Sequence, residues 1–423
     1  MLESTTQQPK ILRKMVYRFA FLSLLLAGIV FGYLKFREWS QDIDMPETYD
    51  TAGMISAIQL HDEGSQAVIF QADGSMLESP GYEPGKTDKD AVWRPDGNRL
   101  FFVSDREENA VNVFRWNIGG KKIARRSYNS RAKGTPQWLP ADAENANKLA
   151  LITSGPFVLE FNPTNGDTRQ VLPPVSKERS ASDPEGGSAG QFETIYGQIG
   201  DSFKLAKWTP DKKFVVAVMR DERGEVLVAQ DLSTDKLPVP IAAGDRIEFD
   251  INPRTGMVVF TVLEYRLFDP TQAPPEMVQK DGSIKLPFRH MIGTIDLAAP
   301  PETAQAPIAR SNSDDAFLAP SISPDGQYLL IVACKVKSRA NYAPEGLIVL
   351  PATPTDVPSG TPILRGEVYE PSWHPNSNAV AFIQYDEQKK RSIWTVGRDG
   401  TNLKNVSAGK GDFANPRFSP QSK

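Results

Sequence analysis

AVWRPDGNRLFFVS, at residues 91–104, decides the fold of this chain. A short strand ends in tryptophan, a Pro-Asp-Gly turn follows, and an apolar strand returns. Proline presets the first corner of such a turn, aspartate hydrogen-bonds its own backbone, and glycine accepts the positive φ that closes it. The segment therefore predicts a tight β-hairpin.

The same hairpin pattern recurs along the chain. Close copies are AKWTPDKKFVVAVM (206–219), PSISPDGQYLLIVA (320–333) and PSWHPNSNAVAFIQ (371–384), looser ones cover 136–153 and 249–262, and NPRFSP (415–420) is truncated. The turn prolines lie at positions 95, 140, 210, 253, 324, 375 and 420, so their spacings are 45, 70, 43, 71, 51 and 45. A period near 45 is typical of a propeller blade of four short strands. The two long spacings predict insertions near 173–204 and 264–289.

The two ends of the repeat region complement each other. Residues 55–79 match the later strands of the last full copy, whereas 415–420 supplies only a first strand. Joining them closes a ring and removes exposed sheet edges. The sequence therefore predicts an all-β, closed β-propeller over 53–423, with seven blades and a closing blade shared by the N- and C-terminal strands. Third strands such as 225–234 alternate apolar and polar residues, which predicts burial on one face only.

The W-x-P-D-G hairpin followed by an apolar strand resembles the WD-like repeat of the TolB-type β-propellers. The repeat also occurs in propellers of prolyl oligopeptidase-like proteins and of some polysaccharide lyases. This resemblance covers nearly all of residues 50–423 and implies the propeller fold. TolB itself carries a separate α/β domain before a six-bladed propeller, and no such domain fits between residue 36 and the first strand. An orthologous TolB role is therefore not expected.

An apolar run, VYRFAFLSLLLAGIVFGYL, occupies residues 16–34. As a helix it would span about 28 Å, close to the thickness of a bilayer core. Basic residues precede the run and acidic residues dominate after it. The sequence thus predicts a cytoplasmic N-terminus over 1–15, a transmembrane signal anchor over 16–35, a linker over 36–52, and a propeller in the periplasm or outside the cell. A cleaved signal peptide and a buried core helix are the alternatives.

Composition limits the chemistry that this chain can perform. One cysteine and three histidines among 423 residues leave few metal ligands and general bases, so we expect no metal, no cofactor and no catalytic residue. The net charge of −4 argues against a nucleic-acid partner. Residues 186–190 match the G-x-S-x-G nucleophile elbow, but they lie in a polar insertion without the strand and helix that the elbow needs. We interpret that match as chance.

Seven further residues have predicted environments. His374 occupies the serine position of a hairpin turn and is expected to bond locally, while His61 and His290 fall at a hairpin tip and a strand start. Cys334 lies in an apolar strand and is expected to be buried and inert. The basic stretch Lys389, Lys390 and Arg391 is interpreted as solvated turn residues.

The mouth of the central channel is the candidate binding site. Residues five positions before the turn prolines are expected there, namely Asp90, Thr135, Leu205, Glu248, Ala319, Glu370 and Asn415. Three of them are acidic, which favours a basic or cationic partner group, and the alternative is solvated strand ends without a ligand. The polar members Asp90, Thr135, Glu248, Glu370 and Asn415 are the candidate binding residues.

These features favour a non-enzymatic, membrane-anchored propeller that acts as a scaffold or accessory subunit for protein partners in a membrane or envelope complex. Its long insertions are further candidate partner surfaces. One alternative is a glycan- or peptidoglycan-binding or lyase-type propeller. Another is a sensor that holds a small ligand in the central channel.

Overall fold

The computed structural model describes residues 50–423 except 72, 108–110, 119–122, 128–132, 141–145, 175–202, 222–223, 235, 268–272, 274, 286–288, 300–304, 312–313, 339–340, 353–361 and 421–423. The expected membrane helix over 16–35 and the G-x-S-x-G match over 186–190 lie outside these residues. Within the described part of the chain, no helix is long and apolar enough to cross a membrane.

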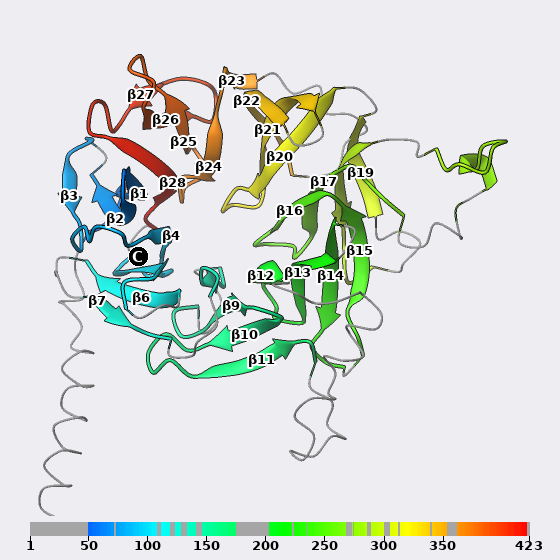
Figure 1. Cartoon of the computed structure of the whole chain (residues 1–423), viewed down its shortest axis with the longest axis horizontal. Helices are drawn as coiled ribbons and strands as arrows, with labels where there is room; N and C mark the ends of the chain where they lie inside the picture. The colour runs from blue at the N-terminus through cyan, green and yellow to red at the C-terminus, as the bar shows by residue number, and fades with distance from the viewer. Residues whose placement is uncertain are drawn as a thin grey trace, which may run out of the picture. The chain divides into compact units, whose positions relative to one another are not determined.

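Seven antiparallel sheets of four strands each make up the repeat region, and they follow one another around a central axis (Figure 1). Blade one consists of β4 (Asp88–Trp93), β5 (Arg99–Ser104), β6 (Asn112–Asn117) and β7 (Ile123–Arg125). Blade two consists of β8 (Gln137–Trp138), β9 (Ala150–Ser154), β10 (Phe157–Phe161) and β11 (Thr168–Leu172). Blade three consists of β12 (Phe203–Trp208), β13 (Phe214–Asp221), β14 (Gly224–Asp231) and β15 (Val239–Gly244). Blade four consists of β16 (Arg246–Ile251), β17 (Val258–Leu263), β18 (His290–Ile295) and β19 (Gln305–Ser311). Blade five consists of β20 (Asp315–Ile322), β21 (Tyr328–Ser338), β22 (Asn341–Pro351) and β23 (Pro362–Arg365). Blade six consists of β24 (Tyr369–Trp373), β25 (Ala379–Tyr385), β26 (Arg391–Gly397) and β27 (Lys404–Asn405).

The seventh blade joins the two ends of the repeat region. Its strand order is β28 (Asp412–Phe418), β1 (Ile55–His61), β2 (Gly64–Phe70) and β3 (Met76–Glu78). The pairing places Ile55 opposite Phe418 and Leu60 opposite Asp412, so red β28 runs beside blue β1 in Figure 1. The prediction of seven blades with a shared closing blade is confirmed.

The repeated turns have the predicted geometry. Gly97 and Gly326 both have a φ of +74°, the conformation that closes the Pro-Asp-Gly turn without steric cost. The Asp96 carboxylate accepts a hydrogen bond of 3.1 Å from the backbone N–H of Asn98, and Asp325 accepts the equivalent bond of 3.0 Å from Gln327. The inner strands β4 and β20 therefore each end in a closed hairpin corner.

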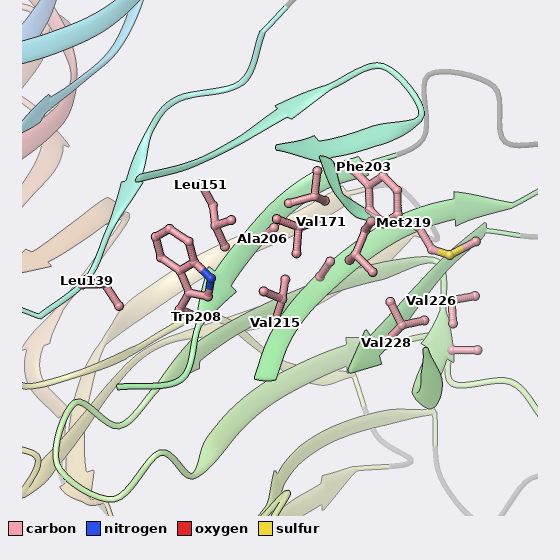
Figure 2. Packing of buried hydrophobic residues seen from close by; sticks show 14 of the residues in the cluster. Leu139, Leu151, Val171, Phe203, Ala206, Trp208, Val215, Met219, Val226 and Val228 are labelled. Carbon is pink, nitrogen blue, oxygen red and sulfur yellow. The ribbon is translucent and has the colours of Figure 1, made fainter. Parts of the chain in front are cut away.

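The hydrophobic core is divided among the interfaces between blades. Among the described residues, six clusters of buried side chains each join two neighbouring blades, and a seventh joins blades five and six and includes Leu263 of blade four. Figure 2 shows the cluster between blades two and three, where Leu151 and Val171 face Trp208 and Val215. Because every sheet packs on both faces, the blades stabilise one another around the ring.

This packing corrects the expectation for the third strands. β14 and β18 are buried along nearly their whole length and are not half-exposed, because neighbouring blades cover both faces of the sheet. Alternating burial is found instead in the inner strands β16 and β20, whose alternate residues open toward the channel.

The two long spacings correspond to connections and not to missing blades. The first lies between β11 of blade two and β12 of blade three, and its residues 175–202 are outside the described part of the chain. The second lies between β17 and β18 within blade four. Its described portion contains one short 3₁₀ helix, Pro275–Met277, and an exposed Val278.

Candidate functional site

The inner strands carry two sets of residues that surround the channel. All seven turn prolines line one concavity of about 850 Å³, together with four tryptophans of the repeat, Trp93, Trp138, Trp208 and Trp373. We call this concavity the proline mouth. The residues five positions before each proline form a second set, which we call the inner ring: Asp90, Thr135, Leu205, Glu248, Ala319, Glu370 and Asn415.

The inner ring is linked by hydrogen bonds from blade to blade. The Glu370 carboxylate of blade six accepts a bond of 2.7 Å from the backbone N–H of Asn415 in blade seven. The Asn415 side-chain amide donates to Asp90 of blade one at 2.8 Å, and the Thr135 hydroxyl of blade two donates to Asp90 at 3.0 Å. Four of the five predicted polar residues are therefore connected by hydrogen bonds into one network across four blades.

The fifth predicted residue makes an equivalent link elsewhere in the ring. Glu248 of blade four accepts a hydrogen bond of 2.6 Å from the backbone N–H of Ala319 in blade five. Its other carboxylate oxygen accepts a bond of 2.7 Å from Arg246. The structure thus brings Glu248 to the channel but not into the hydrogen-bond network of the other four residues.

Backbone geometry at the inner ring explains these links. Asp90, Ala319, Glu370 and Asn415 all have φ between +50° and +52°. Each is the first residue of a bulge, where two residues of the inner strand oppose one residue of the next strand. Left-handed φ values are unfavourable for residues with side chains, especially alanine and glutamate. At Ala319 and Asn415, the N–H of the bulged residue is the group that bonds the carboxylate of the preceding blade.

The acidic residues of the ring have partners within the propeller. Arg391 donates to Glu370 at 2.8 Å, so this arginine contributes to the channel wall. Arg391 begins β26 and its side chain turns inward, so it is not the solvated turn residue that the sequence suggested. Lys389 and Lys390 are exposed. The acidic positions are consequently tied to neighbouring blades and do not form an unpaired negative surface.

Sequence reasoning missed a second layer of channel residues, three positions before each proline. Lys207 of blade three and Asp250 of blade four form an ion pair of 2.8 Å, and Asp250 also accepts a 2.8 Å bond from the backbone N–H of Ile322. Arg417 occupies the same position in blade seven. The period-two geometry of a strand could have identified this layer, because residues two apart point to the same side.

A smaller cavity of about 230 Å³ adjoins the proline mouth, and both include Val92, Gln137 and Arg417. Its lining contains Asp90 and Thr135 of the inner ring, together with Lys204. Lys204 lies 3.4 Å from Glu225, a carboxylate with a side chain only 7% exposed.

The histidines lie in three different blades. The His374 ring contacts the side chain of Asn376 at 2.5 Å within its own turn, as predicted. Burial lowers the pKa of both His374 and His290. His290 is 1% exposed, and neither of its ring nitrogens has a hydrogen-bond partner among the residues that the structure describes. In the described part of the chain, no three histidine, cysteine or acidic side chains are grouped as a metal site would require.

Cys334 has the environment expected from its sequence position. It lies in β21 and is 2% exposed. Burial raises the pKa of its thiol to about 12. The prediction that Cys334 is buried is therefore confirmed.

Known proteins resemble this chain in structure only. A TolB structure from Acinetobacter baumannii shares 13% identity and a TM-score of 0.44 over 88% of this chain and 68% of its own. A putative TolB from Agrobacterium tumefaciens shares 12% identity and a TM-score of 0.41 over 67% and 84%. An oligogalacturonate lyase in complex with manganese shares 10% identity and a TM-score of 0.51 over 85% and 86%. No protein-family model matches the sequence, and no curated protein matches it either.

Identities this low show the fold alone. At that level the oligogalacturonate lyase confirms the expected resemblance to TolB-type and related propellers, and TolB structures are also among the matches. One fold can carry unrelated functions, so the site must supply the functional argument.

Proposed function

We propose that this protein is a non-enzymatic interaction propeller, tethered to a membrane by residues 16–35, which binds a segment of a partner protein at the proline mouth. The proline mouth carries the proposal, because it is a wide concavity lined by all seven turn prolines and four tryptophans. Partner proteins in a membrane or envelope complex are the occupants we expect.

The composition of the proline mouth suits a protein ligand. Prolines on closed hairpin turns form a rigid apolar surface, so little conformational entropy is lost when a partner packs against them. Tryptophan and arginine are the residues most enriched at the centres of protein interfaces, and Arg254 and Arg417 share this lining. The carboxylates of the inner ring act as links between blades and support the mouth from within.

A crosslinking experiment on the full-length protein in its membrane tests the proposal. A photoreactive amino acid is introduced at Asn376, which lines the mouth, or at Tyr385, an exposed residue at the far end of β25 in the same blade. We expect position 376 to capture a defined protein and position 385 not to capture it. The purified partner should then bind the unmodified propeller, and Asn376→Arg should weaken that binding.

Two results would contradict this function. One is equal capture at positions 376 and 385. The other is that position 376 captures no protein, whereas the purified protein binds or cleaves a glycan or peptidoglycan fragment. The second result would favour the glycan-directed alternative.

The membrane tether is part of the proposal and has its own test. A phosphatase that is active only outside the cytoplasm is fused after residue 52, with or without residues 16–35. We expect phosphatase activity in the membrane fraction for the complete fusion and none after the deletion. Activity in the soluble fraction, with a shortened N-terminus, would indicate a cleaved signal peptide instead.

A further inference from the structure

The smaller channel cavity contains a cation without a counterion. Arg417 lies on β28 and lines both this cavity and the proline mouth. Its backbone carbonyl accepts a 3.1 Å bond from the Trp93 indole and a 3.3 Å bond from the Ser56 hydroxyl, which fixes the strand on both sides. Within the residues that the structure describes, its guanidinium has no hydrogen-bond or ion-pair partner, unlike that of Arg391.

Two cations and one anion line the cavity. Besides Arg417, its charged lining residues are Lys204 and Asp90. Asp90 already accepts one hydrogen bond on each carboxylate oxygen, from Asn415 and Thr135. Lys204 is partly neutralised by Glu225 at 3.4 Å. Arg417 is thus a solvent-exposed cation of the lining that has no counterion among the described residues.

Gly134 and Thr153 are in close contact in the wall of this cavity. A side chain at Gly134 would place its Cβ 2.1 Å from the Thr153 hydroxyl oxygen, so the Thr153 side chain would have to move. Gly134, Thr135 and Thr153 all line the cavity, and Gln137 lies beside them. The recess therefore combines one free guanidinium with neutral polar groups able to hydrogen-bond a ligand.

We infer that this cavity binds a carboxylate, with Arg417 as its principal anchor. A guanidinium presents paired N–H donors that match the two oxygens of a carboxylate, and such charge-assisted pairs are stronger than neutral hydrogen bonds. Asp90 lies in the same cavity and disfavours a more highly charged phosphate through like-charge repulsion. The carboxylate can belong to a small organic acid or to the C-terminus of a polypeptide that enters through the proline mouth.

Calorimetric titration of the full-length protein in mild detergent tests the inference. The probes are acetate, succinate, inorganic phosphate, and triglycine with a free or an amidated C-terminus, all at equal ionic strength with chloride as background. We expect a carboxylate probe to bind more tightly than phosphate. Binding of acetate or succinate assigns a small acid, whereas binding of free triglycine alone assigns a chain terminus.

Substitutions locate the site. Arg417→Gln should weaken carboxylate binding about ten- to a hundred-fold, and Arg417→Lys should weaken it less, because lysine keeps the charge but loses the paired donors. Arg169→Gln removes the same charge from an exposed position on β11 and should leave binding unchanged. The thermal midpoint of each variant shows whether the propeller is intact.

Four outcomes would overturn the assignment. The first is no binding of any carboxylate above the chloride background. The second is equal binding by Arg417→Gln and the unmodified protein. The third is tighter binding of phosphate than of every carboxylate probe. Equal binding of free and amidated triglycine, with no binding of acetate or succinate, would also overturn the assignment.

Discussion

The carboxylate of Glu370 accepts a hydrogen bond of 2.7 Å from the backbone N–H of Asn415, and this bond joins blade six to the C-terminal strand that closes the ring. The same carboxylate holds Arg391 at 2.8 Å. A side chain that sequence reasoning placed in a ligand site thus acts first as a connection between blades.

Replacing Glu370 should therefore weaken the fold. Glu370→Ala leaves the Asn415 N–H without its acceptor and removes the ion pair with Arg391, which keeps its bond to the Phe413 carbonyl. We expect the free energy of unfolding to fall by about 1–3 kcal/mol. Glu370→Gln should lose less, because its amide oxygen can still accept from Asn415. Urea unfolding measures both, with the exposed turn variant Glu387→Ala as control. Equal stability of Glu370→Ala and the control would show that the link contributes nothing.

Removal of the closing strand should abolish the propeller. Truncation after Ala408 deletes β28, which carries fully buried Phe413 against Phe70 at 5.1 Å between ring centres. The freed edge of β1 should then pair with other chains. We expect aggregated or oligomeric protein in size-exclusion chromatography and no cooperative thermal transition. Truncation after Pro420 keeps β28 and should behave as the full chain, and a stable monomer ending at Ala408 would disprove the closure.

The architecture was predictable because it depends on local turn chemistry repeated at a fixed period. Proline positions alone gave the number of blades, and the missing first strand near residue 55 gave the shared closing blade. The burial of β14 and β18 was not predictable from their alternation, because it depends on sheets that pack from both sides.

The site was predictable only in its placement. Counting five residues back from each proline located Asp90 and Glu370 at the channel. The sequence contains no signal for the left-handed bulge at Glu370, since such a φ normally favours glycine or asparagine. It also cannot show that Arg391, about twenty positions later, turns inward to bind this carboxylate. These are contacts between strands distant in sequence, which local patterns do not encode.

The repeat tryptophans should contribute unequally to stability. The indole N–H of Trp373 donates to the Ser321 carbonyl of the preceding blade at 3.0 Å, whereas the buried indole N–H of Trp138 has no acceptor among the described residues. Trp373→Phe should therefore cost about 1 kcal/mol more than Trp138→Phe, which loses packing area only. Midpoints of urea unfolding give the comparison. A larger loss for Trp138→Phe would contradict the assigned role of the interblade bond.

Cys334 should be unreactive in the folded protein. Only the thiolate reacts with thiol reagents, and burial raises the pKa of this thiol to about 12. We expect no modification by a maleimide at pH 8 over hours and complete modification in denaturing urea, measured by intact mass. Cys334→Ala in the same assay controls for reaction at other groups. Rapid modification without denaturant would show that β21 opens or that the thiol is not buried.

His290 should make stability depend on pH in the weakly acidic range. Both ring nitrogens are buried and have no partner in the described part of the chain. Burial lowers the pKa of the folded-state imidazole below its ordinary value of 6.5, although Glu264 acts in the opposite direction. The unfolded chain therefore binds a proton more readily than the folded one, and stability falls as pH decreases from about 6.5 toward the lower folded pKa. The slope for one such group is at most about 1.4 kcal/mol per pH unit.

His290→Phe keeps a ring of similar shape and removes the titrating group, so this slope should become smaller between pH 6.5 and 5. Some slope should persist, because burial also lowers the pKa of His374. Urea unfolding at pH 5, 6 and 7 measures the difference, and His61→Phe is the matched control. If His290→Phe and the unmodified protein lose the same free energy on acidification, the imidazole is not held neutral by burial, and its two nitrogens must have acceptors or donors in solution.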